Sequence, residues 1–174
     1  MRYLKTITAL IFLFTFSLGM AQAQPDYDYL IIVSDRARTL LLYEAGNEQE
    51  VLAVYLIGVP KKKYYELPLC GEVKGVEFNP AWWPTKKTRA AYFKSEEIVL
   101  PEKIEPGDPR NAMGKAKLNL QLEGISEPIK IHGTNKPSSI GKKVSRGCIR
   151  MHNESVLELA HIIKNARTKV VFEK

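Results

Sequence analysis

Short segments rich in β-branched, aromatic and aliphatic residues recur along this chain, and residues that favour turns separate them. The first three are YDYLIIV at 27–33, RTLLLYE at 38–44 and VLAVYLI at 51–57, with an AGN turn at 45–47 between the second and the third. Such segments are typical of β-strands joined by hairpins. Four further strands are expected at 75–78, 117–122, 128–132 and 169–172.

Two segments have a helical pattern instead. One covers 86–95. The other begins at Asn153, which we expect to be the N-cap, has Glu154 in its first turn and carries apolar residues as far as Ile163. Strands dominate and do not alternate regularly with helices, so the sequence predicts a mainly β domain. The expected architecture is a β-sandwich or flattened barrel with one or two flanking helices.

The stretch 79–114 is the least regular part of the chain, and it contains five prolines together with Trp82 and Trp83. A long ordered loop in a compact domain is commonly a lid or a binding segment. The paired tryptophans could line a groove for a peptide or a sugar, or they could pack beneath the loop. The sequence leaves both interpretations open.

Residues 1–23 have the features of a signal peptide. Arg2 and Lys5 precede an almost wholly apolar run at 7–20, and AQA at 21–23 has the pattern of small residues that signal peptidase cleaves. The apolar run is shorter than the roughly 20 residues that a membrane-spanning helix needs. We therefore expect export to the periplasm or cell envelope, no stable membrane span after cleavage, and a single domain at 24–174.

The charge balance bears on the partner. The chain has 26 Lys and Arg against 19 Asp and Glu. Arg2 and Lys5 leave with the signal peptide, so the expected charge of the mature chain is 24 − 19 = +5. A moderate positive excess suits an anionic polymer such as a cell wall. No basic run is interleaved with aromatic residues, so we expect no nucleic-acid partner.

The residues that can carry chemistry gather at 129–152, where the chain reads IKIHGTNKPSSIGKKVSRGCIRMH. His132 ends an expected strand, and Cys148 follows 16 positions later. A cysteine attacks carbonyl groups as the thiolate, and a nearby imidazole can take its proton. We therefore predict Cys148 as nucleophile and His132 as base. Gly147 would let the backbone approach the substrate, and the N–H groups of Gly147 and Cys148 could bind an oxyanion.

Arg146 and Arg150 flank the predicted nucleophile. Each could lower the pKa of Cys148 or hold a substrate carboxylate through two hydrogen bonds. For Arg150 a structural salt bridge is an equal alternative. Gly141 is interpreted as a turn residue that helps to bring the two halves of the site together.

Cys70 and Cys148 are the two cysteines of the chain. A disulfide between them is the ordinary expectation for an exported protein, but it would silence a catalytic thiol. We therefore expect Cys70 to be reduced, buried, or bonded only in an inactive state. His152 and His161 are expected at the surface or in packing. A zinc site needs further ligands at short spacing, so we expect neither a metal nor a cofactor.

These residues together resemble the signature of the L,D-transpeptidase catalytic domain family (YkuD-like, erfK-type branch), which is a His-Gly pair followed by Ser/Thr-x-Gly-Cys and an arginine. The matching positions are His132, Gly133, Ser145, Gly147, Cys148 and Arg150. SDRARTLLLYEAG at 34–46 and NAMGKAKLNL at 111–120 are also similar to the family, so the resemblance covers nearly all of 24–174. Two positions depart from it. Arg146 stands where histidine is frequent, and ELPLCGE at 66–72 replaces a Pro-Thr-Pro-x-Gly-x-Phe-like segment of the groove wall.

The resemblance implies a peptidoglycan L,D-transpeptidase. Cys148 would attack the carbonyl between the third residue of a stem peptide and the terminal D-alanine. An amine of a second stem or of a wall-linked lipoprotein would then resolve the thioester. The Gly133 carbonyl would orient the His132 ring, which acts as the sole base because Arg146 replaces the second imidazole. The residues expected to contact the substrate are Ser145, Arg146 and Arg150.

Two alternatives to transpeptidation stay open. The same thioester could be resolved by water, which would make the protein an L,D-carboxypeptidase or an amidase that detaches lipoproteins. The chain could also be a non-catalytic wall-binding module that keeps the fold as a scaffold.

Overall fold

The computed structural model describes residues 25–61, 65–145 and 147–174. The expected signal peptide at 1–23 and Arg146 lie outside the described residues. The strands are β1 (Tyr29–Ser34), β2 (Thr39–Glu44), β3 (Ala53–Pro60), β4 (Leu69–Phe78), β5 (Ala116–Leu122), β6 (Lys130–His132), β7 (Lys143–Ser145), β8 (Ile149–Met151) and β9 (Thr168–Glu173). The helices are α1 (Lys86–Glu96), the short 3₁₀ helix η1 (Pro137–Ser139) and α2 (Asn153–Ile163).

Eight of these strands close into a ring. Neighbouring strands are hydrogen-bonded in the order β2-β1-β9-β4-β5-β6-β8-β3, and β3 pairs with β2 to complete the ring, while β7 pairs with the far end of β3. The prediction of a mainly β, barrel-like domain with one or two helices is confirmed.

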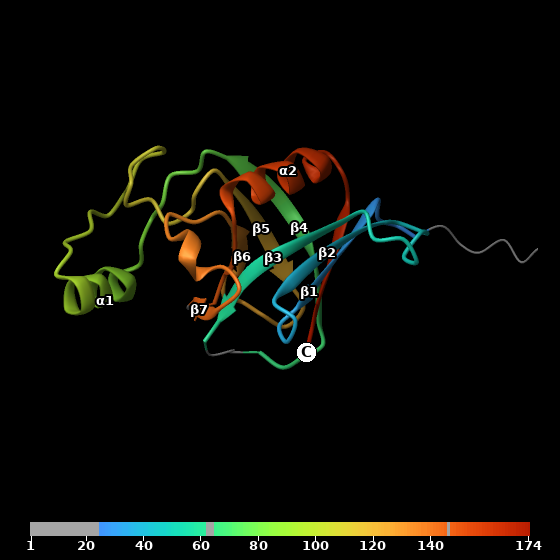
Figure 1. Cartoon of the computed structure of the whole chain (residues 1–174), viewed down its shortest axis with the longest axis horizontal. Coiled ribbons are helices and arrows are strands. Elements are labelled where there is room, and N and C mark those ends of the chain that lie inside the picture. The colour runs from blue at the N-terminus through green and yellow to red at the C-terminus, as the bar shows by residue number, and fades with distance from the viewer. Residues whose placement is uncertain (1–24, 62–64, 146) are drawn as a thin grey trace, which may run out of the picture.

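Alternate side chains along the strands fill the main core. In β1, Ile31 and Val33 are buried there, whereas Ile32 between them is partly exposed. This is the alternation expected of a sheet with one face on the core. Helix α2 lies across one end of the barrel (Figure 1) and contacts β4, β5 and β6. Its buried side chains Val156, Leu159, Ala160 and Ile163 recur at the spacing of one helix face and join the same core.

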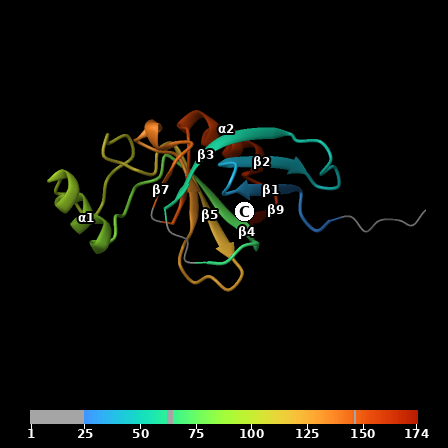
Figure 2. The same ribbon diagram turned by 60° about the horizontal axis from the view of Figure 1, so that its bottom comes forward.

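Residues 79–114, here called the excursion, leave the barrel between β4 and β5. Figures 1 and 2 both show α1 standing apart from the barrel at its tip. The excursion has a small hydrophobic cluster of its own around Trp82, Leu100 and Ile104. Trp82 is therefore a packing residue, whereas Trp83 is 66% exposed beneath the ammonium of Lys103. For Trp83 a binding role stays a prediction.

Two strands extend three or more residues beyond an end that the sequence indicated. β4 begins at Leu69 rather than at 75, because Cys70 and Gly71 pair with β9. β3 was expected to end at residue 57 but continues to Pro60, because its second half pairs with β8 and β7 instead of β2. The three-residue strands β7 and β8 were not expected at all. In each case pairing with a strand far away in the sequence overrides the local turn signals.

The N-cap of α2 is His152, and the prediction that Asn153 has this place is wrong. The side chain of His152 makes no capping hydrogen bond, and Asn153 uses its side chain for tertiary contacts instead. Within the described residues the α-helices are α1 and α2, and neither is long and apolar enough to cross a bilayer.

Candidate active site

The predicted base lies at the end of β6, and the predicted nucleophile lies just before the neighbouring strand β8. The two strands are adjacent and parallel, with Ile131 opposite Ile149 and His132 opposite Arg150. Cys148 is the residue immediately before β8. A separation of 16 positions in the sequence is thus reduced to the spacing between two neighbouring strands.

The alternation of side chains decides which residues share a face. Ile131 and Ile149 are buried in the main core, so the residues next to them project from the opposite face. His132 and Arg150 lie opposite each other on that face, and Cys148, two residues before Arg150, is the diagonal neighbour of His132. Diagonal neighbours are within reach of long and aromatic side chains. The thiol and the imidazole therefore lie on one face of the strand pair, at neighbouring positions.

His132 is buried, with 3% of its surface exposed. Its Nδ1 lies 2.6 Å from the carbonyl oxygen of Gly133. Because a carbonyl can only accept, Nδ1 must donate, and the neutral ring therefore has its free lone pair on Nε2. Burial lowers the pKa of His132 to about 4, the hydrogen bond to Gly133 opposes this, and the charges of Arg150 and Lys130 add to the lowering. The imidazole is neutral at neutral pH and available as a base.

Cys148 is a free, half-buried cysteine. Burial raises the pKa of the Cys148 thiol, while a hydrogen bond from the Lys130 backbone and the charges of Lys130 and Arg150 act in the opposite direction. The net direction is upward, so the resting thiol is protonated at neutral pH. The groups that lower the pKa are nevertheless placed to stabilise a thiolate as it forms. Cys70 is also free, on β4.

The turn before β8 is closed by Ser145. Its hydroxyl donates to the carbonyl of Cys148, and the N–H of Gly147 approaches the same hydroxyl at 3.4 Å. Ser145 is 3% exposed and holds the backbone of Cys148, and its predicted contact with substrate stays a prediction. Gly147 has a φ of +153° with open space around it. The backbone conformation, rather than lack of room, requires glycine here.

Arg150 makes no ion pair with another described residue, which argues against the structural salt bridge that the sequence left open. It is half-buried opposite His132, on the face that carries the thiol, and its predicted contact with a substrate carboxylate stays a prediction. Gly141 has a φ of +75°, as a turn residue requires, and its N–H donates to the Ile57 carbonyl at 3.0 Å. The predicted turn role of Gly141 is confirmed.

Sequence reasoning missed two residues of the site. Lys130 lies two positions before His132, and its backbone N–H reaches the thiol. The period of two along the strand was the signal that could have placed it on the same face. Asn153 bonds to the segment that follows His132. No local signal identifies this role, because an asparagine at a helix start is ordinarily a cap.

The end of the excursion is fastened beside the imidazole. The buried Asn111 donates from Nδ2 to the carbonyls of Pro80 at 2.9 Å and Glu105 at 3.2 Å. These bonds fix the position of the next residue, Ala112, whose backbone lies near the ring of His132 and slightly opposes the lowering of its pKa. The irregular loop predicted from the sequence is thus part of the wall of the site.

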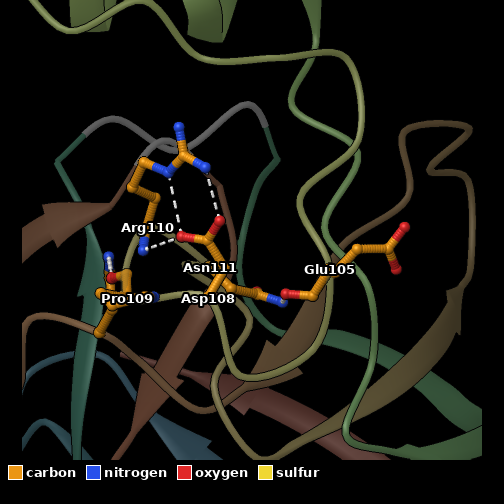
Figure 3. A network of polar contacts seen from close by, with 6 residues as sticks. Glu105, Asp108, Pro109, Arg110 and Asn111 are labelled. Carbon is orange, nitrogen blue, oxygen red and sulfur yellow. Dashed lines mark hydrogen bonds and ion pairs between the residues drawn. The ribbon is translucent and has the colours of Figure 1, made fainter.

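A compact turn precedes Asn111 (Figure 3). The Arg110 guanidinium donates to the two carboxylate oxygens of Asp108 at 3.0 and 2.6 Å, and the Arg110 backbone N–H donates to the same carboxylate at 2.8 Å. Hydrogen bonds from the Arg110 side chain and backbone lower the pKa of Asp108 to about 2. Asn135 in turn donates to the Pro109 carbonyl at 3.0 Å, which ties this turn to the segment after His132.

Two surface pockets are prominent. The larger, of about 820 Å³, lies among β4, β5 and β9, and the smaller, of about 430 Å³, lies between the excursion, Thr134 and Asn153. Cys148 and His132 line neither, so the chemistry of the two side chains rather than pocket size defines the site. The described residues contain no group of three or more His, Cys, Asp or Glu side chains that could hold a metal ion.

Comparison with known proteins identifies the family to which the sequence is similar. The family model of the L,D-transpeptidase catalytic domain, YkuD, matches residues 28–172. The Probable L,D-transpeptidase YcfS of Escherichia coli is 38% identical over 131 residues, which are 74% of this chain and 39% of that protein. The Probable L,D-transpeptidase ErfK/SrfK of Salmonella typhimurium is 33% identical over 143 residues, which are 81% of this chain and 43% of that protein. This chain thus spans about two fifths of the length of these relatives.

Solved structures agree in fold. An L,D-transpeptidase from Mycobacterium smegmatis superposes with a TM-score of 0.55 at 14% identity, covering 85% of this chain and 59% of that one. The helical cell shape determining protein Pgp2 from Campylobacter jejuni gives a TM-score of 0.54 at 16% identity, covering 87% of this chain and 49% of that one.

Proposed function

Since this chain belongs to the L,D-transpeptidase catalytic domain (YkuD) family, we propose that it is a cysteine acyltransferase that acts on peptidoglycan stem peptides. The observation that carries the proposal is the pairing of β6 with β8, which puts a half-buried thiol and a neutral imidazole on one face. The donor is a stem tetrapeptide, and the acceptor is an amine of a second stem or of a wall-linked lipoprotein.

The first half-reaction forms a thioester and releases D-alanine. Nε2 of His132 takes the proton of the Cys148 thiol as sulfur attacks the carbonyl carbon between the third residue and D-alanine. The N–H groups of Gly147 and Cys148 bind the oxygen that becomes negative. The C–N bond then breaks, and the imidazolium returns the proton to the leaving amine.

The second half-reaction reverses these steps with a new amine. The acceptor nitrogen attacks the thioester carbonyl, His132 accepts a proton from that nitrogen, and the C–S bond breaks. The imidazolium then protonates the sulfur, so the enzyme returns to a neutral thiol and a neutral ring. Arg150, on the same face, is proposed to bind a carboxylate of the stem, since a guanidinium matches carboxylate geometry. Ser145 and Arg146 are proposed as further substrate contacts.

Mass spectrometry of the protein after exposure to a tetrapeptide stem tests this proposal. We expect stoichiometric release of D-alanine and an acyl adduct on Cys148. Cys148→Ala should abolish both and keep the fold, and the matched variant Cys70→Ala should keep both. Turnover by Cys148→Ala at the wild-type rate would contradict the mechanism. Wild-type protein that binds the wall but releases no D-alanine and forms no adduct would instead favour the wall-binding role.

Analysis of the released products separates transfer from hydrolysis. Crosslinked dimers, or stems joined to lipoprotein, identify a transpeptidase, whereas trimmed monomers identify an L,D-carboxypeptidase or amidase. We also propose that the protein acts in the periplasm or cell envelope after cleavage before Gln24. Cell fractionation and N-terminal sequencing of the mature protein test this; an uncleaved cytoplasmic protein would refute it.

A further inference from the structure

The side chain of Asn153 joins three segments of the site. Its Oδ1 accepts hydrogen bonds from the backbone N–H of Thr134 at 3.1 Å and of Lys115 at 3.2 Å. Its Nδ2 donates to the Thr134 carbonyl at 3.1 Å. The start of α2, the segment after His132 and the residue that follows the excursion are therefore linked through one carboxamide.

One of these bonds acts on the group that orients the imidazole. The N–H of Thr134 and the carbonyl of Gly133 belong to the same peptide unit. Since that unit is planar and trans, a partner that fixes the direction of the N–H also fixes the direction of the carbonyl. The Gly133 carbonyl is the acceptor for Nδ1 of His132 at 2.6 Å. We infer that Asn153 is a positioning residue that sets the tautomer and orientation of His132 through the peptide unit between Gly133 and Thr134.

Two glycines make room for this carboxamide. A Cβ atom on Gly133 would meet Asn153 Oδ1 at 2.3 Å, and a Cβ atom on Gly114 would meet it at 2.1 Å. Both distances are far below van der Waals contact, so a side chain at either position would displace Asn153. The backbone on both sides is thus shaped around the amide.

The consequence concerns which ring nitrogen is free, and it rests on the proposed function. With Nδ1 protonated and bound to Gly133, Nε2 keeps the lone pair that accepts the thiol proton. If the peptide unit turns, the ring loses its acceptor and both tautomers become populated. The wrong tautomer presents an N–H where a base is needed. Asn153 itself touches neither the thiol nor the transferred proton.

Nitrogen-15 NMR of the histidine rings tests the inference directly, because the two tautomers of neutral imidazole have different nitrogen shifts. His132→Gln identifies the resonances of His132 among the three histidines of the chain. We expect wild-type protein at pH 7 to show one tautomer, with the proton on Nδ1. Asn153→Ala should show a mixture and should alkylate at Cys148 on the order of ten-fold more slowly, since small misplacement of a reacting group can cost about 100-fold.

Two variants separate positioning from general stability. Asn153→Asp keeps the oxygen that accepts from Thr134, so it should keep the single tautomer even though its charge raises the pKa of the ring. Ser34→Ala removes a buried hydroxyl with hydrogen bonds of 3.4 Å elsewhere in the barrel and should change neither readout. If Asn153→Ala does not fold, the spectrum of Asn153→Asp still tests the role of Asn153, because a mixture of tautomers there would overturn it.

The outcomes are distinct for the two proposals. A single tautomer and wild-type alkylation in Asn153→Ala, or a mixture in Asn153→Asp, would overturn the role of Asn153. If Cys148 is alkylated at the same rate in His132→Gln as in the wild type, the proposed acyltransfer chemistry fails instead. The comparison of tautomers between the wild type and the Asn153 variants then still tests the role of Asn153.

Discussion

Burial shifts the pKa values of the two reacting groups in opposite directions. It raises the pKa of Cys148 and lowers that of His132 to about 4, so both are neutral at neutral pH. A preformed thiolate–imidazolium pair is therefore disfavoured, which supports the proposal that the proton moves only when the thiol attacks. This favours general-base catalysis by a neutral ring whose free nitrogen is set by Gly133.

The buried imidazole predicts a specific pH dependence of stability. The pKa of His132 is lower in the folded state than its ordinary value of 6.5, so the unfolded chain binds more protons between these two pKa values. The stabilisation is complete above pH 6.5 and is lost as the pH falls towards 4. The loss should reach about 3 kcal/mol, because one pKa unit corresponds to about 1.4 kcal/mol.

Urea denaturation of wild type and His132→Gln between pH 4 and 8 measures this loss. The free energy of unfolding of the wild type should fall more steeply towards acid than that of the variant, and the difference isolates His132 from the carboxylates. Parallel curves for the two proteins would show that the ring is not held neutral by burial.

Gly147 is the second residue whose backbone carries a testable cost. Its φ of +153° is a conformation that side chains rarely adopt, and such strain costs about 1–3 kcal/mol. Gly147→Ala should lower the free energy of unfolding by that amount and slow alkylation of Cys148, because the turn moves. Gly75 has open space and an ordinary φ, so Gly75→Ala should be nearly neutral in both assays. Equal changes in the free energy of unfolding and in the alkylation rate for the two variants would contradict the interpretation that the φ of Gly147 requires glycine.

At the level of secondary structure, two of the shortest strands, β6 and β8, position the candidate site, and the longest connection, the excursion, lies beside it. Strands β6 and β8 have three residues each, yet they lie between β5 and β3 and are fixed on both sides. The excursion reaches the site through Asn111 and Ala112, but it packs around its own cluster rather than in the barrel core. We therefore expect the excursion to open locally while the barrel stays folded.

Ile104→Ala tests this independence. Ile104 is 1% exposed in the cluster of the excursion, and the loss of a buried isoleucine side chain costs about 2–5 kcal/mol. Hydrogen exchange should become faster in 79–114 and stay slow in β1, β4 and β9, because local openings need not involve the whole fold. Val99, which is 74% exposed, gives the control Val99→Ala, with no expected change. Faster exchange throughout the barrel in Ile104→Ala would show that the two parts unfold together.

For the whole molecule, closure of the ring depends on β9. This strand pairs in parallel with β1 over six residues and antiparallel with β4, so it joins the first strand of the chain to the half that carries the site. Phe172 is 2% exposed in the main core and stacks edge-on against Tyr65. Cooperative stability of the barrel should therefore be sensitive to this residue.

Phe172→Ala should lower the free energy of unfolding by about 3–5 kcal/mol, the usual cost of removing a buried phenylalanine ring. Val171, its neighbour on the same strand, is partly exposed on the other face, so Val171→Ala should cost much less. Thermal unfolding followed by circular dichroism compares the two. A larger loss for Val171→Ala would mean that the inward and outward faces of β9 are assigned the wrong way round.

Local patterns in the sequence identified most of this molecule. The residues of β1, β2, β5 and β9 were recognised from their β-branched, aromatic and aliphatic residues between turn signals, and both α-helices were found within one residue of their starts. The motif around His132 and Cys148 pointed to thiol chemistry, and the family match at 28–172 agrees with the resemblance. The catalytic roles of these two residues stay predictions.

What the sequence by itself determined is what neighbouring residues encode: where strands and turns occur, and which side chains can carry the reaction. Only the tertiary structure decided the length of β4, the existence of β8, the capture of the Thr134 backbone by Asn153 and the neutrality of His132. Each of these depends on strand register or burial, and both arise from contacts between residues far apart in the chain. Short-range periodicity carries no information about such contacts.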